Sequence, residues 1–226
     1  MGVPGGYILF SNFMTLHLGE GIPLPLNAHK AYFPKRLREF CLGTQKLELI
    51  FNEMTRFNDI NKGDTILIPF GGPGSMTNFF DYKGISTITG DIKYHHEYKN
   101  PYKGLKRFRR KYKYNGQPQH FIEWDAKRLP LKDASQKIAI VNPPYGRKCP
   151  TGEYPIDLSL QALAELDRVL IGGGVAYFII PRAWQREFWP RAIEKAKSMK
   201  PQGLYINISN NPFTEQPLSL IRFQKI

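Results

Sequence analysis

The chain has 226 residues, of which 42% are hydrophobic, and this is enough for one large α/β domain with a buried core. No apolar run approaches the roughly eighteen residues that cross a bilayer, and the N-terminus lacks the basic region and apolar stretch of a signal peptide. The two cysteines, Cys41 and Cys149, are too few and too scattered for a disulfide framework or a metal site. We therefore expect a cytoplasmic protein with reduced thiols, no membrane partner and no bound metal.

The formal net charge of +13 is concentrated in one segment of the chain. Residues 92–119 hold nine basic residues against a single acid, Glu97, and aromatic residues interleave them. Cations that meet phosphates and rings that stack on bases are the usual combination on nucleic-acid surfaces. The segment therefore predicts a nucleic-acid partner, with a flexible solvated insertion as the alternative. The basic residues expected at this interface are Lys106, Arg107, Arg109, Arg110, Lys111, Arg147 and Lys148.

Apolar periodicity, with glycine and proline as punctuation, predicts strands that alternate with helices. Residues 1–30 have little periodicity and indicate an irregular N-terminal arm. In chain order we expect a helix over 35–52, a strand over 65–68, a helix over 74–82, strands over 85–89, 121–124 and 138–141, a helix over 155–171, a strand over 175–180, a helix over 183–199, and strands over 203–209 and 218–223. The glycines at 172–174 are expected to stop the helix before them. This alternation predicts a mostly parallel sheet with helices on both faces, and the last two strands can pair antiparallel at its edge.

Three consecutive predicted strands end in residues that can hold a ligand. The first leads into the glycine-rich loop 69–74, where the backbone can approach a ligand closely and the next helix offers free amide donors. Asp91 closes the second strand, where an acid can accept both ribose hydroxyls of a nucleoside cofactor, and Asp125 closes the third, where a carboxylate can accept from an adenine amine. Ligands bind at this edge of open α/β sheets. The alternative is that these glycines and acids are ordinary turn residues.

The tetrapeptide Asn142-Pro143-Pro144-Tyr145 follows the apolar run 137–141 and is the most informative motif. An exocyclic base amine is a poor nucleophile because its lone pair is delocalised into the ring. The Asn142 carboxamide oxygen and the Pro143 carbonyl can both accept from such an amine and favour a pyramidal nitrogen. The prolines hold the backbone rigid without adding donors, and Tyr145 can stack on the base. A base in a duplex must be flipped out to reach such a pocket. The alternative is a plain proline turn.

These motifs resemble those of the DNA amino-methyltransferases, the adenine-N6 and cytosine-N4 enzymes, over roughly residues 27 to 224. The tetrapeptide looks like their catalytic motif, and 69–74 looks like their Pro-Phe-x-Gly-x-Gly loop; shorter similarities lie at 28–34, 90–91, 124–131 and 173–182. The resemblance implies a Rossmann-like class I methyltransferase fold: a mostly parallel seven-stranded sheet with a final antiparallel strand and helices on both faces. It places the methyltransferase domain at 31–226, with a basic insertion at 92–119.

The resemblance also implies S-adenosylmethionine as cofactor and a set of site residues. Asn142, Pro143, Pro144 and Tyr145 would be catalytic. The cofactor would contact Phe33, Pro69, Phe70, Gly72, Gly74, Asp91, Asp125 and Ala126. By position, Phe213 matches the aromatic residue that stacks on the target base.

Two features depart from the family pattern. Its loop usually begins Asp-Pro-Phe, and here Ile68 stands in place of the acid. No target-recognition domain is recognisable, so sequence selection would come from the N-terminal arm, the basic insertion or a specificity subunit. The first hypothesis is methyl transfer to adenine N6 in DNA, and the next is transfer to cytosine N4. The alternatives are an RNA guanine-N2 methyltransferase and a nucleic-acid-binding subunit that keeps the fold without activity.

Overall fold

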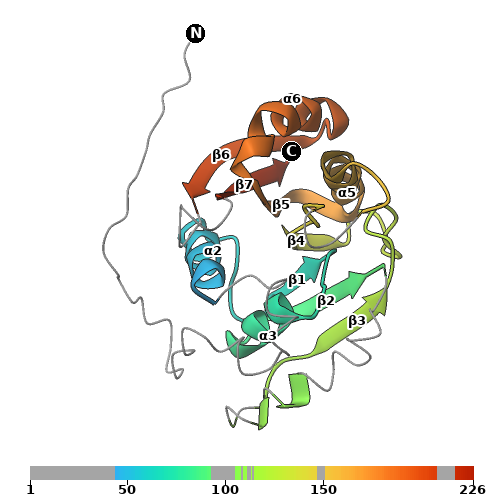
Figure 1. Cartoon of the computed structure of the whole chain (residues 1–226). Coiled ribbons are helices and arrows are strands. Elements are labelled where there is room, and N and C mark those ends of the chain that lie inside the picture. The colour runs from blue at the N-terminus through green and yellow to red at the C-terminus, as the bar shows by residue number, and fades with distance from the viewer. Residues whose placement is uncertain are drawn as a thin grey trace.

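A seven-stranded sheet forms the centre of the computed structural model, which describes residues 44–92, 105–107, 109–110, 113, 115–146, 151–207 and 217–226. Its strands are β1 (Thr65–Ile68), β2 (Ser86–Asp91), β3 (Gln119–Glu123), β4 (Gln136–Val141), β5 (Leu170–Pro181), β6 (Met199–Asn207) and β7 (Leu218–Lys225). They lie in the order β3-β2-β1-β4-β5-β7-β6 (Figure 1). The first five are mutually parallel, and β7 runs antiparallel between β5 and β6. The predicted fold class is confirmed.

The strand order reverses beside β1, and this reversal positions the candidate site. From β1 the chain moves outward to β2 and β3, then returns to place β4 on the other side of β1. Ligands of open α/β sheets bind in the crevice outside the carboxyl ends of the strands at such a reversal. The glycine-rich loop follows β1 and the tetrapeptide follows β4, so the two predicted motifs leave from neighbouring strands.

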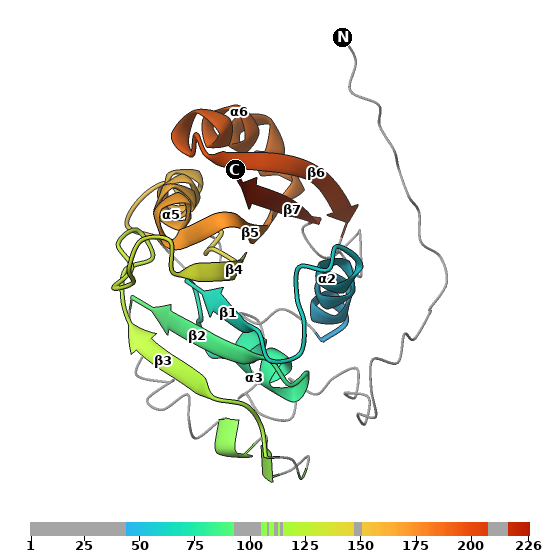
Figure 2. The same cartoon turned by 180° about the vertical axis from the view of Figure 1, so that it is seen from behind.

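Helices cover both faces of the sheet. One face carries α2 (Thr44–Arg56) and α3 (Ser75–Tyr82), and the other carries α5 (Pro155–Val169) and α6 (Gln185–Lys195), which follows the short 3-10 turn η3 (Arg182–Trp184) (Figures 1 and 2). Alternate strand positions supply the two cores: in β5, Tyr177 and Ile179 face α2 and α3, whereas Phe178 and Ile180 face α5 and α6. None of the described helices is long and apolar enough to span a membrane.

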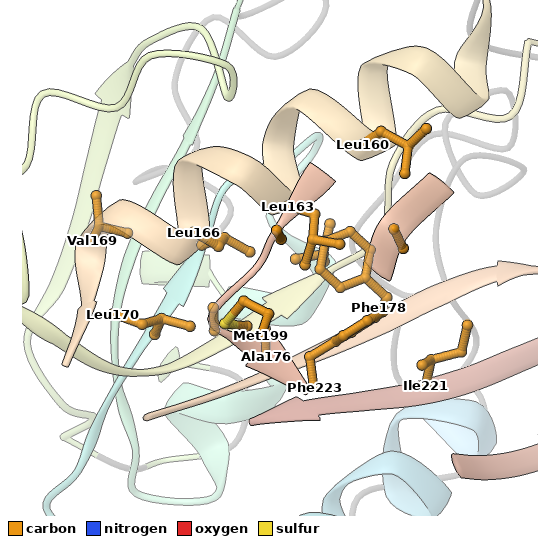
Figure 3. Close-up of a cluster of buried hydrophobic side chains, with 14 of the residues drawn as sticks. Leu160, Leu163, Leu166, Val169, Leu170, Ala176, Phe178, Met199, Ile221 and Phe223 are labelled. Atoms are coloured by element: carbon orange, nitrogen blue, oxygen red, sulfur yellow. The ribbon is translucent and has the colours of Figure 1, made fainter. Parts of the chain in front are cut away.

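The leucine stripe of α5 forms the larger core. Leu160, Leu163 and Leu166 point down onto Phe178 of β5 and Phe223 of β7 (Figure 3). All five side chains are at most 4% exposed. Burying each such side chain contributes about 1.5–3 kcal/mol, so this helical stripe holds α5 against the sheet.

The glycines at 172–174 do not stop α5 as predicted; that prediction is wrong. The helix ends at Val169, and the glycines lie within β5, where the β4–β5 register shifts between Gln136 and Ile138 and Gly173 takes a φ of 78°. A side chain near the C-terminus of the protein caps the helix instead. The Lys225 ammonium donates to the carbonyl oxygens of Asp167 and Leu170, as cations at helix C-termini commonly do.

Other predicted boundaries differ by a few residues. The helix expected over 183–199 begins as η3 and ends at Lys195, because β6 already starts at Met199. The first predicted helix, 35–52, appears as α2 and extends to Arg56, and residues 35–43 lie outside the described residues. The antiparallel pairing expected of the last two strands is confirmed.

A buried ion pair joins the end of α2 to the sheet. Arg222 of β7 donates through Nε and Nη2 to the Asp59 carboxylate at 2.7 and 2.8 Å, and the Tyr177 hydroxyl donates to the same carboxylate. The Arg222 and Asp59 side chains are 5% and 9% exposed. Burial, followed by the hydrogen bond to Asp59, raises the pKa of the Tyr177 hydroxyl, which keeps it a donor. All charges and donors in this cluster are therefore matched.

We expect Arg222→Gln to lower the free energy of unfolding by about 3–5 kcal/mol, because it leaves the Asp59 charge buried without its cation. Arg56→Gln is the matched control, since its ion pair with Glu53 is exposed on the arginine side, and it should change stability by less than about 0.5 kcal/mol. Urea unfolding of both variants measures the difference. Equal effects would contradict a structural role for the buried pair.

Candidate functional site

The glycine-rich loop between β1 and α3 is tied to the end of β2. The Gly71 N–H donates to the Gly90 carbonyl at 2.7 Å, and Gly72 and Gly74 have φ of 49° and 82°, in the left-handed region that favours glycine. A Cβ on Gly71 would lie 2.5 Å from the Thr89 hydroxyl oxygen. Backbone, not side chains, therefore forms this part of the site.

A hollow at this edge is lined by Gly71, Gly72, Gly74, Thr89, Gly90 and Phe121. Four of these six residues have no side chain, so backbone forms much of the lining, and the accessible part of that lining is mostly apolar. Phe121 comes from β3 and would be 3.6 Å from a Cβ on Gly74. Sequence reasoning missed Thr89 and Phe121, since only their register beside β1 and β2 brings them to the loop.

Asp91 ends β2 beside this hollow. One carboxylate oxygen accepts the Gly72 N–H at 2.8 Å, and the other accepts the Ile92 N–H at 2.8 Å. Each carboxylate oxygen can accept a further hydrogen bond, so Asp91 can hold the loop and still receive a ligand hydroxyl. Asp91 therefore lies at the edge of the sheet beside the glycine loop, and its contact with a ribose stays a prediction.

Trp124 joins the ends of three strands. Its indole N–H donates to the Pro69 carbonyl after β1 at 2.9 Å, and its backbone N–H donates to the Asp91 carbonyl after β2 at 3.1 Å. Glycine is required at position 90, which faces the indole, because a Cβ there would lie 2.5 Å from the indole ring and 2.2 Å from the Ile122 carbonyl. The indole thus fixes the strand ends that bear the glycine loop and both predicted acids.

Asp125 opens a turn after β3. Its carboxylate accepts the Lys127 N–H at 2.9 Å and is 38% exposed, while Ala126 is buried. The Lys127 ammonium lies 3.7 Å from Asp125 and donates to Glu153 at 2.7 Å. The hydrogen bond to Glu153 is the main cause of the raised pKa of Lys127. Asp125 is therefore accessible at the same sheet edge as Asp91.

The tetrapeptide follows β4 and is fixed by its own tyrosine. The Tyr145 hydroxyl lies within hydrogen-bond reach of Asn142 Oδ1 and, at 3.0 Å, of the Ile179 carbonyl oxygen. The β4–β5 ladder reaches Val141 and Phe178, and Pro143 has no N–H with which to continue it. Tyr145 supplies a side-chain donor at this point. Burial raises the pKa of the Tyr145 hydroxyl, so the hydroxyl stays protonated.

The ring of Tyr145 contacts Trp184 of η3 edge-on, with centroids 5.6 Å apart and an interplanar angle of 89°. The Asn142 side chain is half-buried, and Pro143 is buried. The four residues therefore form a short, rigid segment whose amide is held from the β5 side. Neither Ile179 nor Trp184 was predicted to orient this motif.

The remaining predicted residues divide into three groups. Phe70 is half-buried against the core under α5 and α6, and Ile68, which stands where the DNA amino-methyltransferase motif carries an acid, is fully buried. Lys106, Arg107 and Arg110 are exposed, whereas the Arg109 guanidinium is bound to Asp81. Five predicted residues lie outside the described residues: Phe33, Lys111, Arg147, Lys148 and Phe213. Within the described ranges, no group of three or more His, Cys, Asp and Glu could hold a metal ion.

Comparison with known proteins supports the identity of the fold. Residues 107–204 match the family described as RMKL-like, methyltransferase domain. No curated protein was found to match the sequence. The matched stretch spans β3, β4, the tetrapeptide, α5, β5 and most of β6.

Several solved structures share the architecture. A SAM-dependent methyltransferase from Methanosarcina mazei aligns with a TM-score of 0.54 at 15% identity, over 76% of this chain and 97% of the other. A candidate methyltransferase from Streptococcus mutans, in complex with SAH, aligns at 0.53 and 13%, over 80% and 98%. A candidate rRNA-methylase from Clostridium thermocellum aligns at 0.50 and 19%, over 78% and 97%. The chain therefore has the Rossmann-like fold of SAM-dependent methyltransferases.

We expect Tyr145→Phe to lower the free energy of unfolding by about 1–2 kcal/mol, because it removes a buried hydroxyl whose single proton lies within reach of two acceptors. Tyr154→Phe is the matched control: its side chain is exposed and its hydroxyl bonds only Glu187 among the described residues, so the change should stay within about 0.5 kcal/mol. Thermal and urea unfolding compare the two. A neutral Tyr145→Phe would show that the hydroxyl does not fix the motif.

Proposed function

We propose that this protein transfers a methyl group from S-adenosylmethionine to the exocyclic amine of a nucleobase in nucleic acid, with adenine N6 of DNA as the first candidate and cytosine N4 next. The observation that carries the proposal is the pairing of β1 with β4. Leu67 lies opposite Ala139, so the glycine loop and the tetrapeptide leave the sheet side by side. One motif suits a nucleoside cofactor, and the other suits an amine acceptor.

The residues around the hollow fit the cofactor. Glycines at 71, 72, 74 and 90 leave backbone where any Cβ would crowd or strain the loop, and α3 begins directly behind it with free amide donors. In this proposal Asp91 accepts hydrogen bonds from the ribose hydroxyls, and Asp125 accepts one from the adenine amine. The S-adenosylmethionine sulfonium supplies an electrophilic methyl group. The shared fold of the S. mutans protein, which was solved with SAH, supports this choice.

Asn142 and Pro143 provide the two acceptors for the target amine. The Asn142 carboxamide oxygen has two lone pairs, so it can accept from Tyr145 and from the amine together. The Pro143 carbonyl is the second acceptor, and the proline ring keeps it in place. Two acceptors on one amine favour a pyramidal nitrogen whose lone pair points towards the methyl donor. Holding these groups in line supplies much of the rate enhancement.

Tyr145 has two roles in this proposal. Its hydroxyl is bound inside the protein, and its ring is half-buried, packed on the core under α2 and α3 and at right angles to Trp184. In this proposal a base drawn into the pocket stacks on the part of the ring that remains accessible. The same side chain would therefore orient the catalytic amide and define the plane of the base.

RNA guanine N2 is the second candidate. The similarity of the fold to the candidate rRNA-methylase of C. thermocellum favours it. Labelled S-adenosylmethionine, incubated with the protein and either DNA or RNA, separates the candidates once the modified nucleoside is identified by mass spectrometry. Methyladenine or methylcytosine in DNA supports the first proposal, and N2-methylguanine in RNA supports the second. Nucleic-acid binding without any transfer supports an inactive subunit.

We expect Asn142→Ala to reduce methyl transfer by at least about a hundredfold while cofactor affinity stays within about twofold, because Asn142 contacts the amine and not the cofactor. Single-turnover transfer and calorimetric titration with S-adenosylmethionine measure the two quantities. Asn52→Ala, at an exposed position of α2, is the control and should change neither. Equal loss of transfer and cofactor affinity would mean that Asn142 belongs to the cofactor site.

Asp91→Asn should weaken S-adenosylmethionine binding by about tenfold or more, because it replaces a charged acceptor that serves both the loop and the ribose. Asp133→Asn, whose carboxylate is 77% exposed and pairs with Arg168 at the surface, is the control. Titration of both variants with S-adenosylmethionine decides the point. Unchanged affinity of Asp91→Asn would remove this residue from the cofactor site.

A further inference from the structure

The described part of the basic segment lies at the amino edge of the sheet. Because β2 and β3 are parallel neighbours, the chain between them must return from the carboxyl edge to the amino edge before β3 starts at Gln119. Residues 105–107 and 109–110 are helical and lie beside the start of β3, away from its arrowhead (Figures 1 and 2). The segment is thus an obligatory crossover as well as a cluster of charge.

A buried carboxylate anchors this crossover. Asp81, in the last turn of α3, has a fully buried side chain that accepts from Arg109 Nε and Nη2 at 3.0 and 2.8 Å, from the Gln117 N–H at 2.7 Å and from Gln119 Nε2 at 3.0 Å. Gly116 makes room for the guanidinium, since a Cβ there would lie 2.1 Å from Arg109 Nε. Four hydrogen bonds to one carboxylate fix how this helical turn is rotated.

The rotation of this helical turn gives it a face that points into the protein and a face that is exposed. Leu105, 4% exposed, and Arg109 lie one helical turn apart and face the protein. Lys106, Arg107 and Arg110 are exposed on the other face, and no described residue forms an ion pair with them. Neighbouring like charges on a helix repel one another and destabilise it. A cluster of cations on one helical face therefore becomes favourable only when an anion binds to it. Arginine, which supplies two of the three cations, matches phosphate geometry in particular.

We propose that Lys106, Arg107 and Arg110 form a remote phosphate-binding surface, which holds the backbone of the nucleic-acid substrate while a base some nucleotides away occupies the site beside Asn142. This inference rests on the proposed function. The five residues of β3 separate the two edges of the sheet by roughly 16 Å at 3.3 Å per residue, and three strand spacings of about 4.8 Å lie between β3 and β4. The direct span is therefore roughly 22 Å, and at 3.4 Å per nucleotide of a stacked strand it takes more than six nucleotides to bridge it.

The length of the substrate is therefore the test. Fluorescein-labelled single strands of five and twenty nucleotides, as DNA and as RNA, are titrated without cofactor over a range of salt concentrations. The combined variant Lys106→Gln, Arg107→Gln, Arg110→Gln should bind the twenty-nucleotide strand at least tenfold more weakly than the unmodified protein. The slope of log affinity against log salt should become less steep by about 2, from about 0.7 per lost phosphate contact. Binding of the five-nucleotide strand should stay within about twofold.

The matched control is Lys195→Gln, Lys197→Gln, Lys200→Gln, which removes the same charge from exposed positions near α6 and β6, at the other end of the strand order. It should bind both strands like the unmodified protein. Equal losses in the control, equal losses for the short and long strands, or an unchanged salt slope would each overturn the inference. A selective loss of binding to vesicles that contain phosphatidylserine, with nucleic-acid binding intact, would also overturn it by assigning the surface to a membrane.

The outcome is separable from that of the proposed function, because the titration needs no methyl transfer. Length-dependent binding that the triple variant abolishes, in a protein that modifies no nucleoside, supports the surface and contradicts the proposed function. Transfer whose kcat/KM is the same on five and twenty nucleotides supports the function and contradicts the surface.

Discussion

The pairing of β1 with both β2 and β4 is the constraint on which the site depends. Parallel strands that are hydrogen-bonded neighbours lie about 4.8 Å apart, so the segments that leave their carboxyl ends cannot be far from one another. The glycine loop leaves β1, Asp91 ends β2, and Asn142 follows β4. Loops far apart in the sequence are therefore held together by a ladder of backbone hydrogen bonds inside the core, and surface changes will not easily separate them.

Backbone and side-chain groups have different structural roles at this edge of the sheet. Glycines at 71 and 90 allow the loop and the strand ends to approach within distances that any side chain would prevent, and Trp124 then holds those ends through its indole N–H. On the β4 side the division is reversed. Pro143 removes a backbone donor, and the Tyr145 hydroxyl replaces it at the Ile179 carbonyl. In both places a residue that lacks a group, the Cβ of glycine or the N–H of proline, lies near an aromatic residue that forms a hydrogen bond.

Sequence patterns predicted the strands and the principal motifs because these signals are local. Residues 65–68 are an apolar run between two glycine-containing turns, and the structure has a strand of the same bounds. What the patterns missed are contacts between distant positions: Trp124 to Pro69 is 55 residues, and Tyr145 to Ile179 is 34. The error at the glycines of 172–174 has the same origin. Glycine is a common helix stop, but here the register of β4 against β5 draws these residues into the sheet, and Lys225 closes the helix.

Charge shows most clearly why composition alone cannot assign a function. Arg107, Arg109 and Arg110 look equivalent in the sequence, yet the carboxylate of Asp81, 28 residues before Arg109, binds one of them and leaves the others exposed. The buried pair of Arg222 with Asp59 is a second example, in which the cation and the acid cancel one another and neither contributes to an outer surface. The excess of +13 therefore acts only through those cations that lack an internal acid. Because Arg109 is held inward, its neighbours are held outward, and a structural ion pair gives the exposed charges a fixed direction.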